Sequence, residues 1–300
     1  MTTGARAAAA GPLVLGFPDD AGQARRLAQA AGLAHAQVAL HRFPDGESLV
    51  RLPARVPPEV IVCRSLQQPN DKLVELALTA RTARELGAAH LTLVAPYLCY
   101  MRQDRAFQPG EAVSQRVVGR LLADWFDALV TVDPHLHRVK DLGEAVPVRR
   151  PRCLTAAPLM GRFLAGVLDA PLLIGPDEES RQWVSAIARQ EGLDYLVGNK
   201  RRLGDREVRI ELPGGGGCGR RLVLIDDVAS TGRTLETAAA ALRSARPESL
   251  DVLVTHALFL EGALARLQAA GVGRVWSTDS IPHPTNRLAL APLLAEALRR

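Results

Sequence analysis

The chain has 300 residues, of which 47% are hydrophobic and 23% charged, a composition that excludes a disordered or collagen-like chain. At about 150 residues per domain, the length predicts two domains, and no apolar run approaches the ~18 residues of a membrane-spanning helix. The net charge is +5, but the 37 basic residues are dispersed and only 4% of residues are aromatic. Because nucleic-acid surfaces usually concentrate basic residues, small anions such as phosphates are the expected partners rather than nucleic acid or membrane.

Short apolar runs alternate with segments of helical periodicity, which predicts parallel sheets covered by helices, the α/β class. The predicted strands are residues 13–17, 60–64, 91–95, 129–133, 172–175, 222–225, 252–255 and 275–278. The predicted helices are residues 24–31, 72–86, 113–125, 179–189, 235–244, 264–269 and 288–298. Residues 38–43 with 48–52, and 194–199 with 207–212, are predicted as two antiparallel ribbons.

The strand–helix series runs through the chain twice, which predicts two similar domains. The boundary is expected in the Pro/Arg-rich segment 147–152, since such segments rarely continue a helix or strand. The predicted domains are therefore residues 1–147 and 148–300. The helix 288–298 is expected to pack wherever its apolar face is covered, the first domain included.

The four cysteines lie far apart and form no CxxC pair. This spacing excludes a zinc knuckle and argues against a disulfide framework, so we expect a cytoplasmic location.

The strongest local signal is the segment 222–235, LVLIDDVASTGRTL. An apolar strand ends in Asp226 and Asp227, and a loop rich in hydroxyl groups leads into a helix. Ligands of open α/β sheets bind beyond the carboxyl ends of strands, where Gly232 lets backbone N–H groups approach a phosphate. The plain alternative is an N-capped helix, but capping needs one Ser or Thr rather than a run of ligand-type residues. The segment resembles the phosphoribosyl-diphosphate-binding loop of the type I phosphoribosyltransferase fold.

Four more segments extend the resemblance: RFPDGE at 42–47, the arginine- and aromatic-rich 96–111, VTVDPH at 130–135 and GNKRR at 198–202. In this order they resemble the ribose-phosphate diphosphokinase family, from about residue 43 to residue 237. The resemblance implies two similar phosphoribosyltransferase-type domains, each a mainly parallel sheet flanked by helices. The ribose 5-phosphate loop would belong to the second domain.

The resemblance also implies residue roles. ATP contacts would come from Phe43, Asp45, Gly46 and Glu47, lent by a neighbouring subunit, and from Arg102, Gln103 and Asp104. Lys200 and Arg202 would be the catalytic cations of a flap that the glycines of 213–219 allow to close. Ribose 5-phosphate would be bound by Asp226, Asp227, Ser230, Thr231, Gly232, Arg233 and Thr234.

His135 and Asp177 match the family's Mg²⁺ site. Because Mg²⁺ prefers oxygen ligands, the imidazole of His135 is expected to act through water or on ATP, with a strand-end structural histidine as the alternative. Glu178 and Glu179 follow Asp177, and Arg233 stands in the phosphate loop, where the family commonly has small residues. These departures bear on regulation by phosphate and ADP more than on the reaction.

The expected reaction is transfer of the β,γ-diphosphoryl group of ATP to O1 of ribose 5-phosphate, with Mg²⁺ and with active sites shared in a homodimer or higher homo-oligomer. Two alternatives remain: a phosphoribosyltransferase that consumes phosphoribosyl diphosphate, and a non-catalytic regulatory subunit of a synthetase. The first would not need residues 43–47, residues 102–103 or the Lys200 flap. The second could lose its catalytic cations or phosphate loop, and both are present here.

Overall fold

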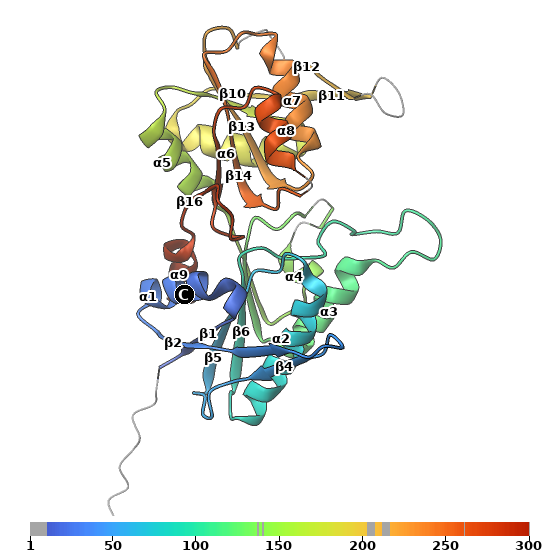
Figure 1. The fold of residues 1–300 in the computed structure, drawn as a ribbon, viewed down its shortest axis with the longest axis vertical. Helices are drawn as coiled ribbons and strands as arrows, with labels where there is room; N and C mark the ends of the chain where they lie inside the picture. The colour runs from blue at the N-terminus through green and yellow to red at the C-terminus, as the bar shows by residue number, and fades with distance from the viewer. Residues whose placement is uncertain are drawn as a thin grey trace, which may run out of the picture. The chain divides into compact units, whose positions relative to one another are not determined.

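The structure is a computed structural model that describes residues 11–136, 138–139, 141–202, 208–211, 217–260 and 262–299. Its contacts divide the chain into two compact units (Figure 1). Unit 1 comprises Met1–Leu154 with Ala291–Arg300, and unit 2 comprises Thr155–Leu290. Each unit is built on one six-stranded parallel sheet, which confirms the predicted α/β class.

Unit 1 has the sheet order β2-β1-β5-β6-β7-β8, with a separate antiparallel ribbon β3-β4. Helices α1 and α9 cover one face of the sheet and α2 and α3 cover the other (Figure 1). The elements are β1 (Leu13–Gly16), the 3₁₀ turn η1 (Pro18–Asp20), α1 (Ala21–Ala31), β2 (Ala34–Gln37), β3 (Ala39–Arg42), β4 (Ser48–Arg51), β5 (Glu59–Cys63), α2 (Pro69–Glu85), β6 (His90–Ala95), α3 (Ser114–Trp125), β7 (Ala128–Val132), α4 (Leu142–Ala145), β8 (Arg150–Leu154) and α9 (Ala291–Arg299).

Unit 2 has the order β10-β9-β13-β14-β15-β16 and its own ribbon, β11-β12. Helices α5 and α6 pack together, as do α7 and α8. The elements are α5 (Ala157–Val167), β9 (Leu172–Gly175), the 3₁₀ turn η2 (Glu178–Ser180), α6 (Arg181–Glu191), β10 (Tyr195–Val197), β11 (Asn199–Arg202), β12 (Val208–Glu211), β13 (Arg221–Ala229), α7 (Arg233–Arg243), β14 (Ser249–Ala257), α8 (Ala263–Ala269), β15 (Val275–Thr278) and β16 (Asn286–Leu288).

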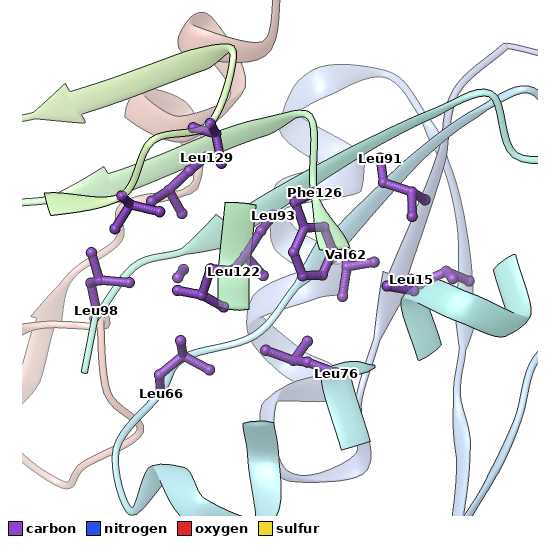
Figure 2. Packing of buried hydrophobic residues seen from close by; sticks show 14 of the residues in the cluster. Leu15, Val62, Leu66, Leu76, Leu91, Leu93, Leu98, Leu122, Phe126 and Leu129 are labelled. Atoms are coloured by element: carbon purple, nitrogen blue, oxygen red, sulfur yellow. The ribbon is translucent and has the colours of Figure 1, made fainter. Parts of the chain in front are cut away.

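The apolar runs of the sequence become central strands because helices cover a parallel sheet on both faces. In unit 1, alternate strand residues such as Leu15, Val62 and Leu93 point toward Leu76 of α2 and Leu122 of α3 (Figure 2). All five side chains are at most 1% exposed. A second core cluster fills unit 2 between β9, β13, β14 and α7. Two independent cores explain how one chain holds two similar domains.

The segment predicted to separate the domains is instead a strand. Residues 150–154 form β8, which pairs in parallel with β7, and the units divide after Leu154 rather than after residue 147. Pro151 is tolerated because β8 is the edge of its sheet, where a missing N–H breaks no ladder. The final helix α9 packs on α1 and β8 and belongs to unit 1.

Two local predictions also differ from the structure. Strand β13 continues to Ala229, so Asp226 and Asp227 lie within the strand rather than after it. The second ribbon pairs residues 199–202 with 208–211, because Tyr195–Val197 joins the main sheet beside β9. The first ribbon, strands β9 and β14 and the helices that the sequence predicts lie within a few residues of their predicted positions, whereas α5 and β2 have no predicted counterpart. In the part of the chain that the structure describes, no helix is long and apolar enough to cross a membrane.

Candidate active site

The predicted ribose 5-phosphate residues and Asp177 lie at the carboxyl ends of neighbouring strands of the unit 2 sheet. Strands β9 and β13 are neighbours, and the chain leaves β9 toward β10 on its other side. In open α/β sheets, such a change of winding direction opens a crevice beyond the carboxyl ends of the strands where ligands bind. Asp177 follows β9, and the loop Ser230–Thr234 follows the carboxylates of β13. The topology therefore places these groups at the ligand-binding edge.

Three carboxyl groups interact at this edge. Asp226 is half-buried and Asp227 is 3% exposed, and the backbone N–H of Asp227 donates to Oδ1 of Asp226 at 3.0 Å. Burial, together with the carboxyls of Asp227 and Asp177, raises the pKa of Asp226 well above its usual value. Asp177 caps η2 in a reciprocal arrangement with Ser180. An edge with this excess of acid suits hydroxyl donors or a cation.

The loop after β13 is held by its own neighbours. Gly232 has φ +73°, a left-handed conformation that favours glycine, and an added Cβ there would lie 3.1 Å from Cβ of Ala263. The N–H of Leu260 donates to the Ser230 carbonyl at 2.9 Å, and Nη2 of Arg266 donates to the Thr231 carbonyl at 2.6 Å. These contacts hold the loop at the N-terminus of α7. Backbone N–H groups at a helix N-terminus favour the binding of anions.

Arg266 is a positioning residue that the sequence did not reveal. It lies in α8 and also approaches Glu236 of α7, with Nε 3.3 Å from Oε2. Its partners are 30 and 35 residues away in sequence. No local motif signals such a contact, because it depends on α7 and α8 packing together.

In unit 1, the predicted ATP residues 43–47 form the turn of the β3–β4 ribbon. The N–H of Phe43 donates to the Glu47 carbonyl, and the N–H of Glu47 donates to Oδ1 of Asp45 at 3.1 Å. Gly46 has φ +94°, which the turn requires. The Phe43 ring is 40% exposed and lies edge-on to His41, with ring centroids 4.9 Å apart. A short, ordered turn thus presents an aromatic ring and two acids to its surroundings.

The loops after β6 and β7 carry the other predicted unit 1 residues. These strands are parallel neighbours, so Arg102–Asp104 and His135 lie at the same edge of the sheet. The Arg102 side chain is exposed and His135 is half-buried. Asp104 is buried and pairs with Nη1 of Arg138 at 2.7 Å, an ion pair that joins the two loops. Within unit 1, Asp104 thus holds the loop through its ion pair with Arg138, while Arg102 is exposed.

Two models of known protein families match this chain, one within each unit. The model of the N-terminal domain of ribose phosphate pyrophosphokinase matches residues 16–125, and that of the phosphoribosyl transferase domain matches residues 159–270. The ribose-phosphate pyrophosphokinase of Methanopyrus kandleri is 37% identical over 289 residues, covering 95% of this chain and 98% of its own. The chain belongs to the ribose-phosphate pyrophosphokinase family. The Thermococcus kodakarensis member is 33% identical over 266 residues, covering 88% of this chain and 92% of its own.

The structures agree with this family membership. Phosphoribosylpyrophosphate synthetase from Mycobacterium smegmatis has the same fold, with a TM-score of 0.84 over 96% of this chain and 98% of that one, at 23% identity. The predicted family, fold and enzyme class are thereby confirmed, pyrophosphokinase and diphosphokinase being two names for one activity. ATP and ribose 5-phosphate are the substrates that this family implies. The roles of individual residues stay predictions.

The two catalytic cations predicted from the pyrophosphokinase resemblance lie in β11. The structure describes the backbone of Lys200 and Arg202 there, while their side chains and residues 203–207 and 212–216 lie outside what it describes. The predicted flap glycines Gly214–Gly216 fall in that part. Among the described residues, no group of three or more His, Cys, Asp or Glu side chains forms a metal cluster. The predicted metal residues are divided between the units, His135 in unit 1 and Asp177 in unit 2.

A cavity of about 190 Å³ lies in unit 1 at the opposite edge of the sheet, where β5, β6, β7 and β8 begin. Its lining includes Arg150, Arg152 and Arg299 but no predicted site residue. Two of these arginines bind backbone carbonyls, Arg152 that of Ala297 and Arg299 that of Ala30. They therefore help to dock α9, and the cavity is separate from the predicted chemistry.

Proposed function

We propose that this chain transfers the β,γ-diphosphoryl group of ATP to O1 of ribose 5-phosphate, giving 5-phosphoribosyl 1-diphosphate and AMP. The observation that carries the proposal is membership of the pyrophosphokinase family over nearly the whole chain, together with the acid and hydroxyl loop at the unit 2 crevice. In this reaction O1 attacks the β-phosphorus, the bond from that phosphorus to the oxygen of AMP breaks, and the O1 proton passes to solvent.

The ribose 5-phosphate subsite is assigned to unit 2. The 5-phosphate accepts hydrogen bonds from backbone N–H groups at the N-terminus of α7 and from the hydroxyls of Ser230, Thr231 and Thr234. Arg233, the first residue of α7, adds a charge beside it. Asp226 and Asp227 accept hydrogen bonds from the ribose hydroxyls, so that O1 is oriented for attack.

The ATP subsite is assigned to the Phe43–Glu47 turn and to Arg102 and Gln103, while the buried Asp104, ion-paired with Arg138, holds their loop. The planar guanidinium of Arg102 matches phosphate oxygens, and the exposed Phe43 ring offers a face to adenine. Lys200 and Arg202 neutralise charge on the diphosphoryl group as it moves, because phosphoryl transfer depends on alignment and electrostatic stabilisation.

Mg²⁺ completes the proposal, and the acidic edge of unit 2 fits it. Asp177 offers oxygen ligands of the kind Mg²⁺ prefers, and a dication would relieve the repulsion that helps raise the pKa of Asp226. His135 suits a contact through water or with ATP. Bound there, Mg²⁺ would neutralise charge on the phosphates. The predicted cytoplasmic location remains part of the proposal.

The decisive assay incubates the purified chain with ATP and ribose 5-phosphate and follows AMP. We expect AMP and phosphoribosyl diphosphate in equal amounts, dependent on both substrates and abolished by EDTA. Consumption of supplied phosphoribosyl diphosphate with a nucleobase, without AMP release, would identify a phosphoribosyltransferase instead. No turnover in either assay would favour the regulatory-subunit alternative.

Shared active sites are a further part of the proposal. We expect a Phe43→Ala/Glu47→Ala variant and a Lys200→Ala variant each to be nearly inactive. If the turn serves the neighbouring subunit of a two-fold dimer, random subunit exchange restores about one quarter of wild-type activity, since half the dimers are mixed and each has one intact site. If the turn serves its own subunit, mixing restores nothing, provided that mass spectrometry of tagged chains confirms exchange.

A further inference from the structure

One buried carboxylate holds the β3–β4 ribbon to helix α2. Glu75 lies within α2 and is 0% exposed. Its Oε1 accepts a hydrogen bond from the Ser48 hydroxyl at 3.0 Å and lies 3.5 Å from the guanidinium of Arg42. Arg42 and Ser48 are partners in the ribbon and flank the Phe43–Glu47 turn. Oε1 of Glu75 therefore contacts both strands of the ribbon, next to the turn.

The second oxygen of Glu75 reaches the sheet. Arg64, the residue after β5, donates Nη2 to Oε2 and is 1% exposed. Its guanidinium lies over the Phe17 ring, 3.8 Å from the centroid, and Nη2 is 3.4 Å from Asp19. Because separating a buried pair leaves an uncompensated charge, Arg64 fixes Glu75 relative to the sheet. The β3–β4 ribbon is thus connected to β5 through the contacts of Arg64 and Glu75.

The corresponding place in unit 2 holds no carboxylate. The residues that precede α2 and α7, Gln68 and Gly232, both have left-handed backbones, with φ +51° and +73°. Counted from these residues, Ala239 occupies the place of Glu75. A methyl group offers no charged link to a ribbon. The link therefore belongs to the ribbon that carries the proposed ATP contacts.

We propose that Glu75 is a positioning residue for ATP binding, which acts through Arg42 and Ser48 on the orientation of the Phe43–Glu47 turn. The inference rests on the proposed ATP contact of this turn. Its consequence is that ATP affinity depends on groups at the root of the turn that do not themselves touch the nucleotide.

Ser48→Ala and Arg42→Met test this link while leaving the buried Glu75–Arg64 pair in place. We expect each to raise KM for ATP about 3- to 10-fold, the effect of one lost hydrogen bond or ion pair, with kcat and KM for ribose 5-phosphate within about twofold. Ser48→Thr keeps the hydroxyl and should restore the wild-type KM. Arg51→Met is the matched control, because Arg51 is an exposed arginine at the far end of the ribbon, opposite Ala39.

Hydrogen exchange of residues 39–51 provides a readout besides activity. Ser48→Ala, Arg42→Met and a folded Glu75→Gln variant should all exchange faster in this segment than wild type, whereas Arg51→Met should not. Unchanged exchange and unchanged KM for ATP in Ser48→Ala and Arg42→Met would overturn the inference.

Phe43→Ala separates this inference from the proposed ATP contact. A raised KM in Phe43→Ala with normal Ser48→Ala and Arg42→Met would leave the ATP contact standing and reject Glu75 as a positioning residue. A normal KM in Phe43→Ala would reject the contact, and the inference with it.

Discussion

Units 1 and 2 follow one plan and use it for different ends. Each begins its sheet with strand, helix and strand, inserts a two-stranded ribbon, and then returns to the sheet on the other side of the first strand. Each consequently has a crevice beside that first strand, between β1 and β5 in unit 1 and between β9 and β13 in unit 2. What differs is the charge placed there.

In unit 1 the crevice is filled by paired charges. Lys72 lies 2.9 Å from Asp19 and donates to the Ser65 carbonyl at 2.7 Å, while Arg64 pairs with Glu75. Burial raises the pKa of Asp19, but Arg64 and Lys72 outweigh it, and the pKa lies below its usual value. These charged groups are paired with one another inside unit 1, although burial raises the pKa of Asp20 beside them despite the nearby Lys72.

In unit 2 the equivalent place carries the carboxyl groups of Asp177 and Asp226. Both β1 and β9 end in Gly and lead through Pro into an acidic 3₁₀ turn. Among the described residues, however, neither Asp177 nor Asp226 forms an ion pair. Here burial and the neighbouring carboxyl groups of Asp227 and Asp177 raise the pKa of Asp226. The two units thus place different charges at the same point of one plan: ion pairs in unit 1 and, in our proposal, the ribose 5-phosphate subsite in unit 2.

The largest effect is expected from Arg64→Met. It removes the buried counter-charge of Glu75 and leaves it with the exposed Arg42 at 3.5 Å, which should cost about 3–5 kcal/mol of stability, measured by urea unfolding. Arg266→Met in unit 2 is the matched control, since this arginine is 36% exposed and should cost only about 1 kcal/mol. Equal losses in the two variants would contradict the contrast between the crevices.

Lys200→Ala tests the unit 2 ribbon, which carries the predicted catalytic cations. Loss of a transition-state contact of about 3–4 kcal/mol should lower kcat by roughly two to three orders of magnitude, with little change in either KM. Arg201→Ala, in the same strand and with the same charge, should stay close to wild type in steady-state assays. An unchanged kcat for Lys200→Ala would reverse the assignment.

Asp226→Asn removes a charge from the unit 2 crevice. We expect ribose 5-phosphate to bind about 10- to 100-fold more weakly, because hydrogen bonds to a charged group contribute about 1.5–3 kcal/mol, with ATP affinity unchanged in titration calorimetry. Asp19→Asn, which removes a carboxylate from the equivalent region of unit 1, should leave both affinities near wild type. Weaker ATP binding with normal sugar-phosphate binding would exchange the two subsites.

The same two variants should shift stability with pH in opposite directions. The raised pKa of Asp226 means that its contribution is full below pH 3.8 and is lost as pH rises through the folded value. Asp226→Asn should therefore be more stable than wild type at pH 7 by about 1 kcal/mol, the common scale of relieved active-site strain. The lowered pKa of Asp19 contributes above pH 3.8 and is lost on acidification. Asp19→Asn should thus be the less stable at pH 7, and unfolding across pH 3–8 would detect either sign being wrong.

A further contrast concerns the left-handed residues before α2 and α7. Gly232→Ala should cost about 1–2 kcal/mol, because a Cβ is strained there and approaches Ala263. Gln68→Gly should change stability by less than about 1 kcal/mol, since relief of strain offsets the added chain entropy. Melting temperatures of the two variants, compared with wild type, would test this asymmetry.

Features that depend on local chemistry could be predicted from the amino-acid sequence. Apolar runs such as 172–175 and 275–278 became strands with those bounds, since burial on both faces needs only a short hydrophobic segment. The order of the acid, hydroxyl and arginine motifs pointed to the family that the comparisons confirmed. The repeated strand–helix series likewise indicated two similar domains before any contact was known.

Features that depend on residues far apart in sequence could be seen only in the tertiary structure. Residues 150–154 became an edge strand because β7 offered a free side for pairing, and α9 returned to unit 1 because α1 and β8 covered its apolar face. The contacts of Arg138 with Asp104, Arg266 with Thr231 and Glu75 with Ser48 span 34, 35 and 27 residues. No local pattern encodes such pairs, because each arises only when separate elements pack against one another.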